Sequence, residues 1–198
     1  MSAIHTSMRL LLILFLTVIL QSCLVKSLNP FYTQASVVKI QEFEGSWFIL
    51  DDQGKARTQS PWIFSEGEIL TFDEKGRGGP FTYKVFKLGD EIFLDVIPSS
   101  NSRLDASEFW TMSIWPLHSL LKITIADDQL SLIPLNYRWF EEKKKLGELS
   151  LPMIIPSDED WGFLNVTAQE WAAFYLKNKD EKNLFGDDIK IILKRKKI

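Results

Sequence analysis

Apolar residues follow two patterns along this chain, one unbroken and one alternating. The unbroken pattern runs from Leu10 to Leu20, directly after the cation Arg9. Its length fits the roughly 7–15 residues of a signal-peptide core and falls short of the roughly 20 residues that a membrane-spanning helix needs. The run therefore predicts a secretion signal, with translation starting at Met1 or at Met8.

The alternating pattern begins near Phe43 and predicts a strand-rich domain. Short segments rich in β-branched and aromatic residues are separated by turn formers, such as those in 74–80 and 88–90. The predicted strands are 43–50, 68–73, 81–87, 91–97, 109–114, 118–125, 129–135, 161–166 and 189–194. This order predicts a mainly β (α+β) fold, a single antiparallel β-barrel or strongly curved sheet of about 7–8 strands with two helices inserted late in the chain.

One predicted strand is apolar on both of its faces. Ile92, Leu94 and Val96 share one face, while Phe93, Asp95 and Ile97 share the other, with Asp95 as its one polar member. Since alternate residues of a strand point to opposite sides of the sheet, this strand is predicted to be central and covered on both sides.

Two segments late in the chain carry helix signals. Asn136 is a predicted N-cap for a helix over 137–146, which Gly147 ends. Thr167 and Glu170 form a capping box that opens a second helix through about Lys177. Helical spacing gives this second helix one aromatic face, made by Trp171, Phe174 and Tyr175. We expect it to lie against the outside or the open end of the sheet.

These patterns divide the chain into three parts: a signal peptide over 1–22, a tether over 23–41 and a β domain over 42–198. The tether is rich in turn-forming polar residues and has no sustained period. Phe31 and Tyr32 interrupt its polar sequence, so we expect them to dock on the domain surface.

The end of the apolar run carries the only cysteine of the chain, Cys23, after Leu20-Gln21-Ser22. This tetrad resembles the lipobox of bacterial lipoproteins, although Gln21 departs from the usual small or aliphatic residue. The resemblance implies that Cys23 is acylated after removal of the preceding peptide, and that the protein is anchored in the cell envelope by lipid. Leu24 stands where an inner-membrane retention aspartate would be, which favours the outer membrane. The alternative is an uncleaved anchor ending in an ordinary cysteine.

Gly45-Ser46-Trp47 stands at the head of the first predicted strand of the domain. It resembles the opening of lipocalin-like (calycin) barrels, in which the tryptophan plugs the closed end. The post-cysteine segment 28–33, the segment 93–96 and the Thr167-capped helix also resemble an uncharacterised group of bacterial lipoproteins, a likeness that implies no activity.

Composition argues against a nucleic-acid partner and is compatible with a cavity lined by aromatic residues. The net charge is −3, and the basic clusters at 143–145 and 194–197 are interpreted as a solvated helix face and a frayed end, so no nucleic acid is expected. All seven tryptophans follow the predicted signal. They favour a broad core or a cavity lined by aromatic residues.

Candidate catalytic groups are few. His118 is the only histidine after the signal, and it could combine with Asp95 and either Ser119 or Ser113. No nucleophile elbow accompanies them, so His118 is interpreted as a hydrogen-bonded residue at a strand start, and no enzyme is expected. The acidic run 158–160 lacks the spacing of a calcium loop. We expect no metal and no cofactor.

Binding is therefore the predicted function. The first hypothesis is a small hydrophobic ligand or lipid held in a barrel pocket lined by Trp47, Phe72, Phe86 and Trp110. The second is a protein-interaction or assembly module of the envelope with a filled barrel, and a hydrolase centred on His118 is a distant third.

Overall fold

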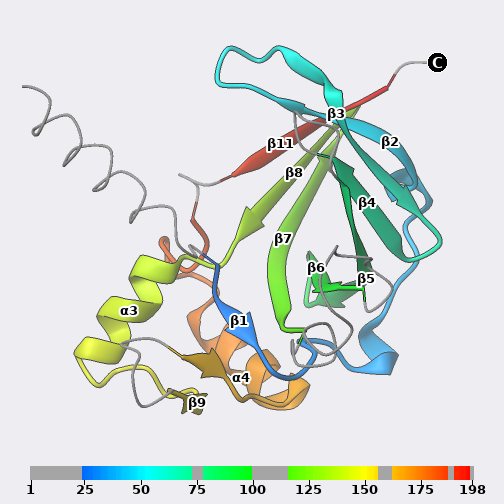
Figure 1. Ribbon diagram of the computed structural model, residues 1–198. Helices are drawn as coiled ribbons and strands as arrows, with labels where there is room; N and C mark the ends of the chain where they lie inside the picture. The colour runs from blue at the N-terminus through cyan, green and yellow to red at the C-terminus, as the bar shows by residue number, and fades with distance from the viewer. Residues whose placement is uncertain (1–23, 73–77, 100–115, 156–161, 187–189, 197–198) are drawn as a thin grey trace, which may run out of the picture.

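Eight antiparallel strands close into a barrel in the computed structural model, which describes residues 24–72, 78–99, 116–155, 162–186 and 190–196 (Figure 1). The barrel strands are β2 (Gly45–Leu50), β3 (Ala56–Ser65), β4 (Glu68–Phe72), β5 (Gly78–Leu88), β6 (Glu91–Pro98), β7 (His118–Ala126), β8 (Gln129–Pro134) and β11 (Ile191–Arg195). Each strand pairs with the next, and β11 closes the barrel by pairing with both β8 and β2. The predicted antiparallel barrel is confirmed.

Strand β3 was not predicted from the sequence. Its first half is polar, and it contains Pro61, which cannot donate a hydrogen bond to a ladder. Pro61 pairs with Phe48 beside a register irregularity that falls between Phe48 and Leu50. The local break in the ladder explains how a proline is tolerated in a barrel strand.

The two faces of the barrel wall belong to two separate hydrophobic cores. Leu94 of β6 packs inside the barrel, in a core that includes Trp47, Phe64 and Leu130. Phe93, the next residue, packs outside the barrel in a core shared with the helices. The prediction that this strand is covered on both of its faces is confirmed.

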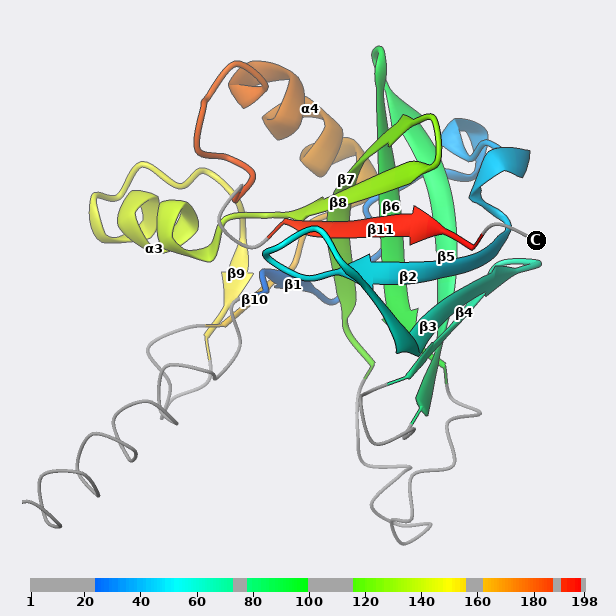
Figure 2. The same cartoon turned by 90° about the horizontal axis from the view of Figure 1, so that it is seen from above.

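Both predicted helices form, on the side of the barrel away from β3 and β4 (Figure 2). Helix α3 (Tyr137–Lys145) begins after Asn136, whose side chain accepts from the backbone N–H groups of Arg138 and Trp139. Helix α4 (Ala168–Asn178) begins after Thr167 with the predicted capping box. Its aromatic residues are buried against the outer face of the barrel wall, where Tyr175 meets Phe93 with ring centroids 5.0 Å apart.

The segment after Cys23 is part of the domain and is not the tether expected from the sequence. Strand β1 (Lys26–Ser27) pairs with β7 and with β10 (Phe163–Leu164), which in turn pairs with β9 (Met153–Ile154). Two short 3₁₀ helices, η1 (Gln34–Ser36) and η2 (Gln41–Phe43), then lead to β2. Val25 and Phe31 are buried in the outer core. Phe31 was expected to dock on the domain surface and is fully buried in the outer core. Val25 was not singled out, because a single Leu-Val pair sets no period.

Several predictions fall on residues outside the described parts of the chain. They are the signal peptide over 1–22, Cys23, the strand over 109–114 with Trp110 and Ser113, and the acidic run 158–160. Among the helices that the structure describes, none has both the length and the apolar character required to cross a membrane.

Candidate ligand-binding cavity

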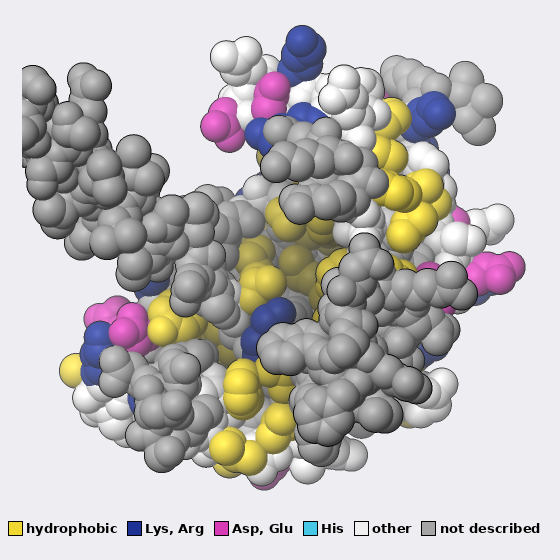
Figure 3. Space-filling model, viewed as in Figure 1, with side chains coloured by type: hydrophobic (Ala, Val, Ile, Leu, Met, Phe, Trp, Pro, Cys, Tyr) yellow, Lys and Arg dark blue, Asp and Glu magenta, His cyan; other side chains and the backbone are white. Residues whose placement is uncertain are grey.

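The barrel encloses a cavity of about 300 Å³ toward the end where β1 joins the wall. Its walls are mainly apolar side chains that point inward from most of the barrel strands. Figure 3 shows hydrophobic side chains gathered in this hollow. The lining includes Trp62, Ile69, Phe81, Leu94, Val96 and Leu121. The cavity is partly open, and its volume is at the lower end of the roughly 300–1,000 Å³ of small-molecule sites.

The opposite end of the barrel is closed by aromatic side chains around Trp47. The Trp47 ring is fully buried, its Nε1–H donates to the carbonyl oxygen of Phe43 at 3.1 Å, and the Arg195 guanidinium lies 4.4 Å from its ring centroid. Arg195 also donates to the carbonyl oxygens of Glu42 and Glu44. These contacts connect β2, β11 and the residues directly before β2.

Trp47 therefore belongs to the closed end and is not in the lining of the cavity, in contrast to the prediction. Phe72 and Phe86 were also expected to line it. Phe72 lies on the face of β4 opposite to Ile69 and Thr71, both of which line the cavity. Trp110 lies outside the described residues.

Phe86 lies in the outer core, where its ring stacks on Phe93 with centroids 5.5 Å apart. Strand β5 carries apolar residues on both faces, and its inward set is Phe81, Tyr83 and Val85. Sequence reasoning selected the wrong face because both faces of β5 are apolar, while the residues inside the barrel are fixed by its pairing with β4 and β6.

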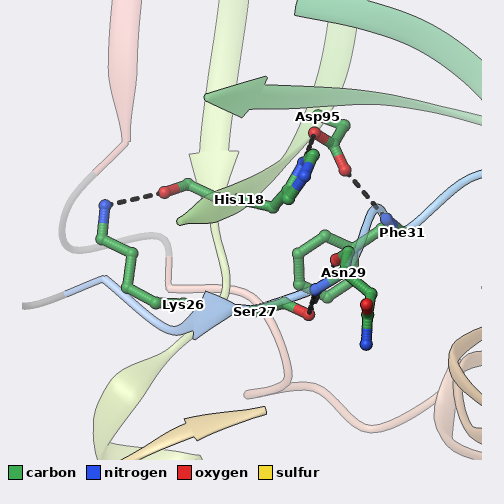
Figure 4. Close-up of polar contacts among 7 residues, drawn as sticks. Lys26, Ser27, Asn29, Phe31, Asp95 and His118 are labelled. Atoms are coloured by element: carbon green, nitrogen blue, oxygen red, sulfur yellow. Dashed lines mark hydrogen bonds and ion pairs between the residues drawn. The ribbon is translucent and has the colours of Figure 1, made fainter. Parts of the chain in front are cut away.

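We call the end of the cavity at which β7 begins its mouth, and the N-terminal segment lines this end. Strand β1 pairs with β7 at Lys26–Ser119, just beyond the point where Pro134 ends the ladder between β7 and β8. Leu24 and Lys26 consequently join the lining. The Lys26 ammonium donates a 2.8 Å hydrogen bond to the Ser119 hydroxyl oxygen (Figure 4). Burial lowers the pKa of Lys26 below its usual value.

Asp95 and His118 are brought together on the outer face of the wall. Asp95 is 2 % exposed, one of its carboxylate oxygens lies 2.6 Å from His118 Nδ1, and the other accepts from the Phe31 N–H at 2.9 Å (Figure 4). Ser119 follows His118 in the strand, so its hydroxyl points to the cavity on the opposite side. The Asp95 carboxylate therefore holds the N-terminal segment against the barrel, the His118 imidazole pairs with that carboxylate, and Ser119 is not aligned with them.

A second hollow, of about 400 Å³, lies on the barrel surface between residues 37–40 and β5. At its edge the Tyr83 hydroxyl donates to the Glu44 carboxylate at 3.3 Å, and burial together with the negative charge of Glu44 raises the pKa of Tyr83 to about 12. Although larger, this hollow is more open and more polar than the barrel cavity, which makes the barrel cavity the better candidate site for an apolar ligand.

Fold and cavity together define the class of this protein: a closed eight-stranded antiparallel β-barrel, compatible with a calycin-like fold, with an apolar space inside. No family model matches the chain, and no curated protein and no solved structure matches it. Within the described residues, no group of three or more His, Cys, Asp or Glu side chains is arranged to hold a metal ion.

Proposed function

We propose that this protein is a lipid-anchored component of a bacterial envelope whose barrel binds a small hydrophobic ligand or lipid. The observation that carries the proposal is the partly open, mainly apolar cavity of about 300 Å³ in the barrel. Barrels of about eight strands are just wide enough to hold one small ligand, and apolar walls favour an apolar guest because its transfer from water is favourable.

The position of the mouth supports a lipid as the guest. Leu24 lines the cavity and is bonded directly to Cys23, and consecutive Cα atoms are only about 3.8 Å apart. Acylation at Cys23 would place the anchor beside the mouth, so that a lipid leaving the bilayer has a short path into the barrel. Leu24 after the cysteine favours the outer membrane as the site of anchoring.

The anchor is tested by replacing Cys23 with serine. We expect Cys23→Ser to abolish incorporation of radiolabelled fatty acid and to leave the preceding peptide uncleaved, because serine offers no thiol for acylation. The matched control is Ser22→Ala, which keeps a small residue before the cysteine and should remain labelled. Continued labelling of Cys23→Ser would contradict the lipid anchor.

Ligand binding is tested by filling the cavity. Val96 and Thr71 line it from β6 and β4, and we expect Val96→Phe and Thr71→Phe each to reduce the co-purified amphiphile at least fivefold. The measurement is native mass spectrometry of the purified full-length protein, in which a bound amphiphile adds its mass to the chain. Leu176→Phe, at an α4 side chain that is 53 % exposed, is the control and should leave the bound fraction unchanged.

A protein-interaction role is favoured by a different observation. Among the described residues, strand β9 is at the end of the strand order and has exposed Ile154 beside exposed Ile155, so its outer edge could pair with a strand of another envelope protein. Absence of any bound amphiphile from the wild-type protein, together with loss of a co-purifying partner in Ile154→Lys, would support this role over ligand binding.

A further inference from the structure

Lys26 is a cation in an apolar setting. Its side chain lines the cavity together with Leu24, Leu121 and Pro134. Within the described parts of the chain, no carboxylate lies within 4.0 Å of its ammonium group, and its one hydrogen bond there goes to Ser119. Lys26 is half-buried, and removing part of a charged side chain from water without an acidic partner is costly.

Ser119 adds a second donor at the same place. The residue is 4 % exposed, and its hydroxyl oxygen accepts from Lys26. A hydroxyl can accept and donate at once, so its proton remains able to bond an oxygen atom of a guest. The lining also holds the indole of Trp62 and Thr71, whose hydroxyl already donates to the Gly79 carbonyl oxygen. Among the described residues, Lys26 carries the only positive charge of the lining.

We propose that the ligand is a single-chain amphiphile with a carboxylate head group, which Lys26 and Ser119 bind at the mouth while its chain lies between Trp62, Leu94 and Leu121. This inference rests on the proposed ligand-binding function and specifies the chemistry of the guest. A carboxylate completes the missing ion pair of Lys26, and charge-assisted hydrogen bonds are roughly twice as strong as neutral ones.

The size of the cavity supports a single chain. At about 300 Å³ it is at the small end of ligand sites, which suits one acyl chain better than the two chains of a membrane phospholipid. The pairing of β1 with β7 at the mouth places the polar end of the guest near the opening and its chain toward the closed end around Trp47.

Lys26 has one purely structural alternative role. Its aliphatic stem could cover apolar surface while the ammonium reaches toward water, as long basic side chains often do. In that case, removal of the charge would change the affinity for acidic and neutral guests equally. The comparison of two guests that differ only in the head group therefore separates the two roles.

The experiment uses two photoreactive probes, a decanoic acid and a decanol that carry the same alkyl diazirine, on the purified full-length protein. We expect the acid to label cavity residues at least tenfold more than the alcohol at equal concentration. Lys26→Met keeps the length of the side chain and should reduce acid labelling about tenfold while alcohol labelling stays within twofold. Lys26→Arg should retain most of the acid labelling, and so should Lys84→Met, which removes an exposed lysine from the outside of β5.

Equal labelling by acid and alcohol in the wild-type protein would overturn the head-group assignment, as would parallel loss of both in Lys26→Met. Stronger competition by decyl phosphate than by decanoic acid would overturn the choice of a carboxylate. Failure of both probes to label the cavity would instead contradict the proposed binding function itself.

Discussion

Replacing Trp47 with alanine is expected to lower the free energy of unfolding by about 3–5 kcal/mol, the usual cost of truncating a large buried aromatic residue. The ring is fully buried at the closed end, so its loss leaves a large void. The substitution also removes the hydrogen bond to Phe43 and the stacking surface for Arg195, which lies over the ring. Urea unfolding followed by far-UV circular dichroism measures the change.

Leu176→Ala is the control for this measurement, because Leu176 is largely exposed on α4 and should change stability by less than about 0.5 kcal/mol. A loss of stability in Trp47→Ala no larger than that of the control would contradict the position of Trp47 in the barrel core.

Replacing Phe31 with alanine is expected to destabilise the protein by a similar amount, about 3–5 kcal/mol. Phe31 is fully buried, and its ring meets Trp171 of α4 edge to face with centroids 5.1 Å apart. Its backbone N–H also donates to Asp95. Since Phe31 connects the N-terminal segment to both the barrel and α4, its truncation should loosen that segment, which hydrogen exchange at Lys26 and Ser27 would report.

Gln34→Ala tests the same segment at an exposed position and should be nearly neutral. If Phe31→Ala were as mild as Gln34→Ala, residues 24–41 would be a tether after all, and the mouth of the cavity would lack its β1 wall.

The sequence was sufficient to predict the parts of the fold that depend on local pattern. Runs of β-branched and aromatic residues between turn formers revealed β5 to β8, and in β8 the apolar residues also recur at the strand period. The helix caps at Asn136 and Thr167 were readable because capping depends on residues only three positions apart. Strand β3 was missed because Pro61 and a polar first half hide its inward residues Trp62 and Phe64.

The candidate site was less accessible to sequence reasoning, because it depends on contacts between distant segments. Phe72 and Phe86 were chosen for their aromatic character, but register places them on the outer side of the wall. Lys26 gave no signal, since a lysine in a polar segment is ordinary until β1 pairs with β7 more than ninety residues later. That pairing turns a surface-type residue into part of an apolar cavity.

A crystal structure of the full-length protein, purified without added lipid, tests most directly whether the barrel is a container. We predict one elongated feature of electron density between Leu94 and Leu121, ending within hydrogen-bonding distance of the Lys26 ammonium. A barrel interior filled by the chain's own side chains, with no space between these residues, would contradict it.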